Sequence, residues 1–287
     1  MTAVPTLGDV VAVLDGLYPP DTAEGWDAVG LVAGDPAAPV RTVLLAVDPV
    51  ATVVDEALDL GVDLVVTHHP LFLKGVHSVA ATTFKGAVVH RLLRAGVALY
   101  NAHTNADAAP RGVADALADA VGLVDRAPLV AHADGAETGI GRVGRLAAPT
   151  TLHDFARRVA GALPATAQGV RVAGDLDATV RTAAVVGGSG DALFDAVRAA
   201  AVDVYVTSDL RHHPASELRE RALFEHGTPY LVDTAHYASE WPWLRYAATD
   251  LAAGVTARLA ARGEEGTVTC TVSTRVTDPW TTTVTVP

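Results

Sequence analysis

The chain has almost no cysteine and lacks any long apolar run. Cys270 is the only cysteine in 287 residues. A single thiol cannot form an intrachain disulfide, and it cannot build a thiolate zinc site, which needs several cysteines. No segment has the roughly 18 consecutive apolar residues of a membrane span. The first residues, Met1 to Leu17, lack the basic start and apolar centre of a signal peptide. We therefore expect a cytoplasmic protein with no membrane-embedded part.

Positive charge is also scarce. The chain has 21 Lys and Arg against 33 Asp and Glu, which gives a formal net charge of −12. No basic cluster is large enough to follow a nucleic-acid backbone, so we expect no nucleic-acid footprint. Half of the residues are hydrophobic and 19% are charged, a composition that excludes a disordered chain. An anionic substrate is still compatible with this charge, because a bound metal ion can reverse the local field.

A strand–helix–strand pattern occurs twice along the chain. Residues 43–66 contain two short apolar runs of strand length, separated by a helical stripe, and residues 183–206 repeat this arrangement. Strands that are apolar on both faces are typical of buried parallel βαβ units. Each repeat is soon followed by His-His-Pro, at 68–70 and at 212–214. We interpret this as an internal duplication; the alternative is a chance similarity between valine-rich strands.

The predicted fold class is α/β, with two related lobes whose mostly parallel sheets are flanked by helices. The stretch 125–150 carries four glycines and is expected to be rich in loops. It is therefore the predicted boundary between an N-terminal lobe, residues 1–125, and a C-terminal lobe, residues 126–287.

A histidine pair follows the first repeat directly. In open α/β sheets, ligands bind outside the carboxyl ends of the strands, and His68 and His69 lie at such an end. Pro70 breaks the extended chain here, which allows both imidazoles to face one site. Imidazole is the commonest metal ligand of proteins. Alone, however, this tripeptide is more typical of a surface loop.

Two further segments offer metal ligands after predicted strands. Residues 101–107 bring together His103 and Asp107, and the alternative for this segment is a solvated turn. His236 and Glu240 have the i, i+4 spacing that places two side chains on one helix face. The alternative there is a solvated pair at the start of a helix.

A glycine-rich turn, Gly187-Gly188-Ser189-Gly190, lies between a predicted strand and a predicted helix. Such turns can present an anion site at a helix N-terminus, but this one has neither a Walker lysine nor GxGxxG spacing. A tight turn is the favoured interpretation.

Together, the imidazoles and carboxylates suit zinc, iron, manganese or nickel. A carboxylate can bridge two ions through its two oxygen atoms. Five protein ligands shared by two ions would leave coordination positions open, which is a property of catalytic rather than structural sites. Water bound at such a position becomes acidic enough to act as a nucleophile.

The order of these motifs resembles the NIF-three-like dinuclear metal-centre family, also labelled GTP cyclohydrolase I type 2 homologues. The resemblance extends from about residue 8 to Trp280. It is carried by WDAVGL at 26–31, THHPL at 67–71, HTNAD at 103–107, GIGRVG at 139–144, GGSG at 187–190, TSDLRHH at 207–213 and HYASE at 236–240. The chain departs from the family at Ala28, Ser208 and Ala235, where the family usually has Asn, Gly and Gly. Some family members carry an inserted central domain, for which this chain is too short.

The resemblance implies a site for two divalent metal ions per protomer in the cleft between the lobes. The ligands that it implies are His68, His69, Asp107, His236 and Glu240. It also implies a homo-hexamer built as a trimer of dimers. His103 and His213 lie inside family motifs without being ligands, and they are candidates for orienting or acid–base roles, or for structural histidines.

The expected function is a metal-dependent hydrolase of the GTP cyclohydrolase kind, with a metal-bound hydroxide as nucleophile and a nucleotide or other small molecule as substrate. Two alternatives use the same ligands. One is a non-catalytic protein that stores metal or acts as an interaction partner, and the other is a nucleotide phosphoesterase.

Overall fold

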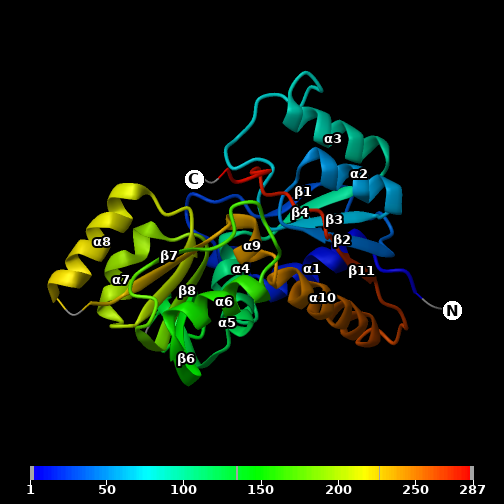
Figure 1. The fold of residues 1–287 in the computed structure, drawn as a ribbon. Helices are drawn as coiled ribbons and strands as arrows, with labels where there is room; N and C mark the ends of the chain where they lie inside the picture. The colour runs from blue at the N-terminus through cyan, green and yellow to red at the C-terminus, as the bar shows by residue number, and fades with distance from the viewer. Residues whose placement is uncertain (1–2, 134, 226, 285–287) are drawn as a thin grey trace. The chain divides into compact units, whose positions relative to one another are not determined.

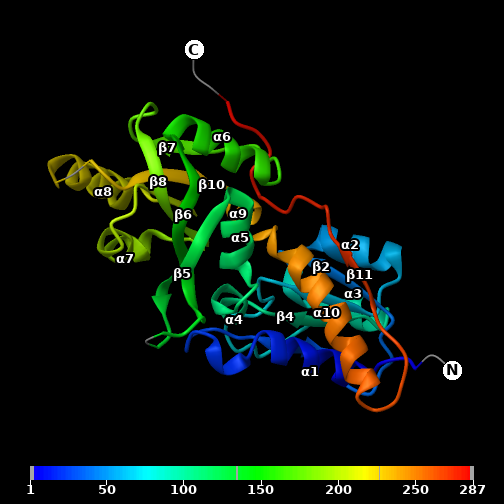
Figure 2. The same cartoon turned by 90° about the horizontal axis from the view of Figure 1, so that it is seen from below.

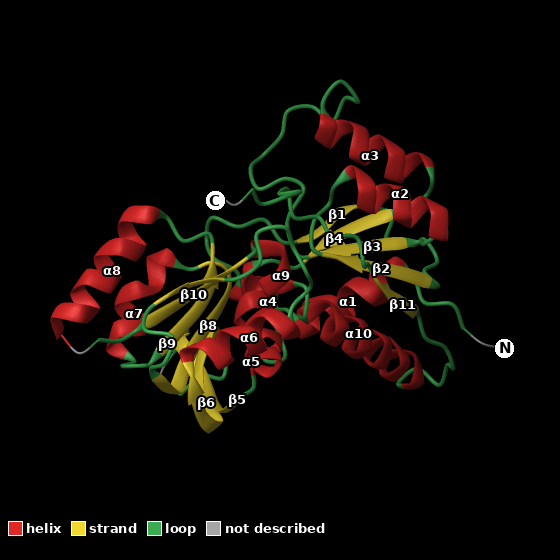
Figure 3. Ribbon diagram, viewed as in Figure 1, coloured by secondary structure: helices red, strands yellow, loops and turns green. Residues whose placement is uncertain are grey.

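The structure is a computed structural model, and it describes residues 3–133, 135–225 and 227–284. The chain forms two compact units (Figure 1). The first consists of residues 1–109 and 244–277, and the second consists of residues 110–243 and 278–287. Each unit contains one sheet covered by helices (Figure 3), as predicted for an α/β protein of two lobes.

The first unit has a five-stranded sheet in the order β1-β4-β3-β2-β11. Its strands are β1 (Gly30–Ala33), β2 (Thr42–Ala46), β3 (Leu64–Thr67), β4 (Ala98–Asn101) and β11 (Thr269–Val272). All neighbours pair in parallel except β1, which is antiparallel to β4. The helices are α1 (Leu7–Leu17), α2 (Ala51–Leu60), α3 (Phe84–Arg94), the short α4 (Thr104–Ala108) and α10 (Trp243–Ala260), with a 3-10 turn at Pro20–Thr22.

Both faces of this sheet are buried, which explains why its central strands are continuously apolar. On one face, α2 and α3 pack against Leu44, Val65 and Leu99 in a single hydrophobic cluster. On the other face lie α1 and α10 (Figure 2).

The second unit has a six-stranded sheet in the order β5-β6-β8-β9-β10-β7. Its strands are β5 (Leu123–Ala131), β6 (Gly139–Thr151), β7 (Arg171–Ala173), β8 (Thr179–Ser189), β9 (Val204–Ser208) and β10 (Tyr230–Thr234). Strands β8, β9 and β10 are parallel, and the other pairs are antiparallel. The helices are α5 (Val113–Val121), α6 (Leu152–Ala162), α7 (Phe194–Ala199), α8 (His212–Glu225) and α9 (His236–Glu240), with a 3-10 turn at Asp191–Leu193.

The two sheets repeat one another in register and in hydrogen bonding. Val43 of β2 lies opposite Leu64 of β3, and Ala183 of β8 lies opposite Val204 of β9. The two partners are the same number of residues apart in the sequence in both pairs. The carboxylate of Asp63 accepts from the amide of Thr42 (2.9 Å) and its hydroxyl (3.1 Å). Asp203 accepts from the amide and hydroxyl of Thr182 at the same two distances. This correspondence supports the predicted internal duplication.

Residues 125–150 are not loop-rich, so this expectation was wrong. They form most of the long antiparallel hairpin of β5 and β6. Three of the four glycines lie in β6: Gly141, for example, has φ +65°, and a Cβ atom on it would lie 2.7 Å from Cγ2 of Val186. Glycine is needed where the backbone takes this conformation at such close approach, so its presence does not indicate a loop.

The lobe boundary at 125/126 stays a prediction, but the compact units divide the chain differently. The chain passes into the second unit at residue 110 and returns at residue 244. The return follows from β11, which pairs in parallel with β2 and so completes the first sheet. Within the described residues, none of the helices combines the length and the apolar character needed to cross a membrane.

Helix α1 is tied to the end of α10 through one buried carboxylate. Asp9 closes a capping box with Thr6 and accepts from Arg258 (3.0 Å) and Arg262 (2.7 Å). The hydrogen bonds from Arg262, followed by those from Arg258 and Thr6, outweigh burial and hold the pKa of Asp9 far below its usual range.

We predict that Asp9→Asn destabilises the protein at pH 7 and that this difference becomes smaller at pH 3. A depressed folded-state pKa stabilises the native state fully above the unfolded pKa of about 3.9, and the stabilisation is lost progressively as the pH falls from there through the folded-state pKa. Urea unfolding of both proteins at pH 7 and pH 3 measures the effect. An equal difference at both pH values would contradict this role of Asp9.

Candidate metal centre

The first group of candidate ligands lies at the carboxyl ends of two neighbouring strands. His68 and His69 follow β3, while His103 and Asp107 lie at the start of α4, just after β4. Strands β3 and β4 are parallel, with Thr67 opposite Asn101, so both chains leave the sheet at the same edge. The topology therefore brings residues more than 30 positions apart to one place.

The side chains of this group converge. One ring nitrogen from each of His68, His69 and His103 lies within 4.8 Å of the others. Nε2 of His68, which is fully buried, lies 3.6 Å from Oδ1 of Asp107. The structure thus brings together three of the predicted metal ligands, and it adds His103 as a fourth potential donor.

Two of these rings are held through Nδ1 by oxygen atoms of neighbouring segments. Nδ1 of His68 lies 3.0 Å from the carbonyl oxygen of Ala102, which can only accept, so Nδ1 carries the hydrogen. Nδ1 of His69 lies 2.7 Å from Oδ1 of Asp48, which follows β2. A donor at Nδ1 leaves the lone pair on Nε2, the atom that can bind a metal ion.

His103 is held in the same way by Asp27, at 2.9 Å. Asp27 also accepts from the amide (3.0 Å) and hydroxyl (2.6 Å) of Thr104. Burial of Asp27 opposes its ionisation, but the hydrogen bonds from His103 and Thr104 are stronger and hold the pKa of Asp27 far below its usual range. Asp27 is therefore a charged acceptor that fixes the tautomer of His103.

Asp48 is itself fixed by the C-terminal part of the chain. Its Oδ1 accepts a hydrogen bond from Nδ1 of His69, and its Oδ2 accepts one from the hydroxyl of Thr277. Both carboxylate oxygens are therefore engaged, which limits rotation of Asp48 and of the ring that it holds. Sequence reasoning identified neither Asp48 nor Thr277, because nothing local links them to the His-His-Pro motif.

The second group lies in the other unit, on the short helix α9 that follows β10. His236 and Glu240 face one another at i, i+4, with Nε2 2.9 Å from Oε1. Nδ1 of His236 lies 2.6 Å from Asp209, which follows β9. The hydrogen bond from His236, partly opposed by burial, lowers the pKa of Asp209. His236 is therefore held like His69 and His103, with Nε2 directed toward a carboxylate.

The glycine-rich segment, which was expected to be a tight turn, forms the end of β8 as far as Ser189, and it makes room for this second group. Gly188 has φ +67°, and a Cβ atom there would lie 2.7 Å from Oε1 of Glu240 and 3.0 Å from Nε2 of His236. Its amide donates to the hydroxyl of Ser239 (2.9 Å), which also receives a hydrogen bond from Ser208 (3.2 Å). Ser208, a departure from the family pattern, thus supports the end of β8. This segment leaves space for His236 and Glu240, a role the sequence did not suggest.

Both groups fit a divalent metal ion. Imidazole and carboxylate are ligands of zinc, iron, manganese and nickel, and each group offers both. Two donor atoms about 3 Å apart can share one ion when each metal bond is about 2.0–2.2 Å long. The pairs His68–Asp107 and His236–Glu240 are near this separation. Gly188 lets the ligand atoms of Glu240 and His236 lie close to its backbone, where any other residue would collide with them.

His213 does not join either group. It lies on the exposed first turn of α8, with its ring 5.2 Å from that of His212. Among the interactions of the described residues, none connects it to His236 or Glu240. The structure therefore gives no support to the orienting or acid–base role considered for His213.

Comparison with known proteins establishes the family. Residues 5–269 match the model of the Duf34/NIF3 (NGG1p interacting factor 3) family, and the chain belongs to this family. A Streptomyces coelicolor protein named GTP cyclohydrolase 1 type 2 homolog is 52% identical over 280 residues, covering 97% of this chain and 94% of the relative.

A Mycobacterium tuberculosis protein of the same name is 37% identical, with 96% of each chain covered. Its alignment of 381 positions exceeds the length of this chain, so that relative carries an insertion that is missing here, as predicted. Among solved structures, a hypothetical protein of Staphylococcus aureus matches with a TM-score of 0.82 and 28% identity, covering 97% of this chain and 99% of that one.

We predict that Gly188→Ala weakens metal binding at least about tenfold, because moving His236 or Glu240 disturbs an ion as strongly as losing an orienting partner. The alanine also adopts an unfavourable left-handed conformation, at a cost of about 1 kcal/mol. Chelator-competition titration with Co²⁺ measures the affinity. Gly161→Ala in α6 is the control, since a Cβ atom there meets no atom within 4 Å. Equal affinities in the two variants would show that Gly188 does not shape the site.

We predict that Thr277→Val weakens metal binding about tenfold, because Asp48 loses one of the two bonds that fix it and His69 with it. Thr277→Ser keeps the hydroxyl and should restore the affinity. The same titration measures both variants, beside Thr281→Val at an exposed position of the tail. Equal loss in the valine and serine variants at position 277 would contradict a role of the hydroxyl.

Proposed function

We propose that this protein is a metal-dependent hydrolase whose centre holds two divalent ions. The proposed ligands are His68, His69, Asp107, His236 and Glu240. The proposal assigns both groups of side chains to one centre, as the resemblance to the family implies. It extends to this chain the activity class that its relatives carry in their name, GTP cyclohydrolase 1 type 2 homolog.

The observation that carries this proposal is the state of the histidines. In both groups, Nδ1 of each histidine faces an oxygen acceptor, so that a metal ion would be bound through Nε2. Surface histidines in solvated loops have no reason to share this arrangement. Metal-binding histidines need it, because the acceptor fixes the ring and strengthens its basicity.

A divalent ion bound by these residues supplies Lewis acidity, which makes bound water acidic and polarises a carbonyl or phosphoryl oxygen of a substrate. The role of the chain's own residues is to hold the ion and to orient the rings that bind it. Asp48, Asp27 and Asp209 keep the rings of His69, His103 and His236 in one tautomer. That leaves His103 as the residue able either to add a ligand or to move a proton at Nε2, since Nδ1 is fixed on Asp27.

The test is the metal content of untagged protein, measured by plasma mass spectrometry. We expect about two ions per protomer in the unaltered protein, as in two-metal hydrolases. Asp107→Ala should lose most of the metal, because a carboxylate that bridges two ions serves both. His103→Ala should lose less, because His103 is not among the implied ligands. Equal metal content in the two variants would argue against a bridging Asp107.

Catalysis is tested on metal-loaded protein with GTP, by following formate release and phosphate release separately. Formate supports the cyclohydrolase, and phosphate supports a phosphoesterase. If metal is bound but neither product forms from GTP or other nucleotides, the protein is a metal-binding protein without this activity. Little metal even after reloading would overturn the metal centre itself.

A further inference from the structure

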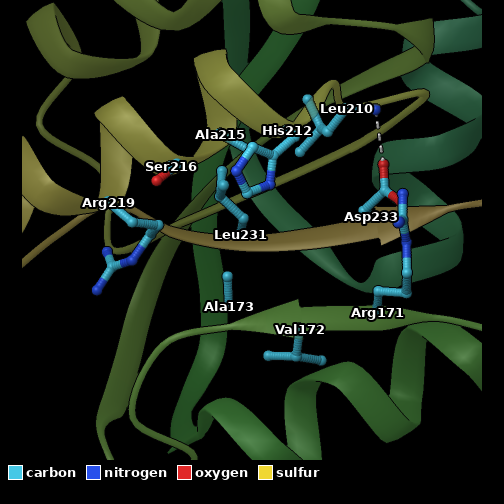
Figure 4. Close-up of a pocket in the computed structure, with 10 residues that line it drawn as sticks. All are labelled: Arg171, Val172, Ala173, Leu210, His212, Ala215, Ser216, Arg219, Leu231 and Asp233. Carbon is cyan, nitrogen blue, oxygen red and sulfur yellow. Dashed lines mark hydrogen bonds and ion pairs between the residues drawn. The ribbon is translucent and has the colours of Figure 1, made fainter.

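The second unit also contains a pocket. It is formed between α8 and the strands β7 and β10, and has a volume of about 430 Å³ (Figure 4). That volume is in the range of small-molecule sites, roughly 300–1,000 Å³. Among the described residues that line it, none is an expected metal ligand. Nothing in the proposed hydrolase chemistry uses this pocket.

The pocket exists because small side chains meet where α8 crosses the sheet. Leu218 of α8 and Leu231 of β10 belong to the hydrophobic cluster beneath the helix. Ala215 and Ser216 line the pocket from the helix, and Ala173 lines it from β7. These three side chains are too short to close the space, so the floor of the pocket is apolar and open to a ligand.

One end of the pocket carries a neutralised ion pair. Nε of Arg171 donates to Oδ2 of Asp233 at 2.8 Å. The other oxygen of Asp233 accepts from the amide of Leu210 at 3.1 Å. At this end, the charges of Arg171 and Asp233 are therefore paired with one another, and both oxygen atoms of Asp233 accept hydrogen bonds.

The other end carries Arg219, a partly buried cation. Figure 4 shows Arg219 and Arg171 on opposite sides of the lining. Arg219 donates to the carbonyl oxygens of Gly227 (3.1 Å) and Pro229, and its guanidinium carbon lies 5.0 Å from the ring centroid of Tyr230. Among the ion pairs of the described residues, none joins Arg219 to a carboxylate. Burial lowers the pKa of Arg219, as expected for a cation without an anionic partner.

We propose that this pocket binds a small organic anion with an apolar body. The anionic group lies at Arg219, and the apolar body rests on Ala173 and Leu231. His212, Ser216 and Arg219 are spaced at i, i+4 and i+7, so they share one face of α8 and all line the pocket. His212 and Ser216 therefore supply further hydrogen-bond donors on the same face as Arg219. Together the three side chains favour a carboxylate or a phosphate ester.

The experiment is calorimetric titration of the full-length protein with phenyl phosphate and with phenylacetate, which separate phosphate from carboxylate. We expect at least one of them to bind with a Kd below about 1 mM. Inorganic phosphate lacks the apolar body and benzyl alcohol lacks the charge, so both should bind at least about tenfold more weakly. Equal binding of inorganic phosphate or benzyl alcohol would overturn the proposed ligand class.

Two variants locate the bound probe. Ser216→Trp fills the pocket from an exposed position, and Arg219→Gln removes the cation; each should weaken binding at least about tenfold. Arg221→Gln is the matched control, because Arg221 lies on the same helix and pairs with Glu225 outside the pocket. Binding that persists in Ser216→Trp would overturn the proposal, as would the absence of binding by either aryl anion up to about 10 mM.

Asp107→Ala separates this pocket from the metal centre. If the probe binds in the pocket, its affinity is unchanged in this variant. Loss of binding in Asp107→Ala would place the probe at the metal centre and overturn the proposal, while leaving the metal centre itself supported.

Discussion

The hydrogen bond from Nδ1 of each candidate histidine to a fixed oxygen atom is the interaction on which both groups depend. An imidazole has two nitrogen atoms, and an unrestrained ring can present either of them. Here the oxygen atom that accepts from Nδ1 decides which nitrogen atom is presented. It is a backbone carbonyl for His68 and a carboxylate for the other three rings, from Asp48, Asp27 and Asp209. The acidic residues around the strand ends therefore do more than set the net charge: in three of the four rings they determine which nitrogen atom can bind a metal ion.

The duplicated sheet explains why ligands occur at corresponding places in both units. In the first unit they follow the parallel pair β3 and β4, and in the second unit His236 and Glu240 follow β10, the partner of β9. The registers show that His69 and Asp209 occupy corresponding positions after β3 and β9. One is a candidate ligand and the other orients a ligand. The same position after the second strand thus carries a candidate metal ligand, His69, in one unit and a residue that orients a candidate ligand, Asp209, in the other.

Much of this arrangement could be predicted because it is local. A buried strand followed directly by His-His-Pro, as at His68, or by a short helix with His and Glu at i, i+4, places donors at the carboxyl edge of a parallel sheet; the second His-His-Pro starts four residues after β9 and does not. The orienting residues could not be predicted in this way. Asp48 precedes His69 by 21 positions, and Thr277 belongs to the tail, so only the folded first sheet brings them together. The β6 glycines were misjudged and the role of Gly188 was missed for a related reason: a glycine that accommodates a neighbouring chain cannot be told from a loop or turn glycine without that neighbour.

Asp209 shows how the second group is kept in place at some conformational expense. Its φ of +56° is unfavourable for a residue with a Cβ atom, by about 1–3 kcal/mol, and needs surrounding structure to maintain it. The next residue, Leu210, donates its amide to Asp233, which is held in turn by Arg171. The turn that orients His236 and the charged end of the α8 pocket therefore share one carboxylate. A change at Asp233 would disturb both, whereas Ser216 and Arg219 lie on α8 and can report on the pocket alone.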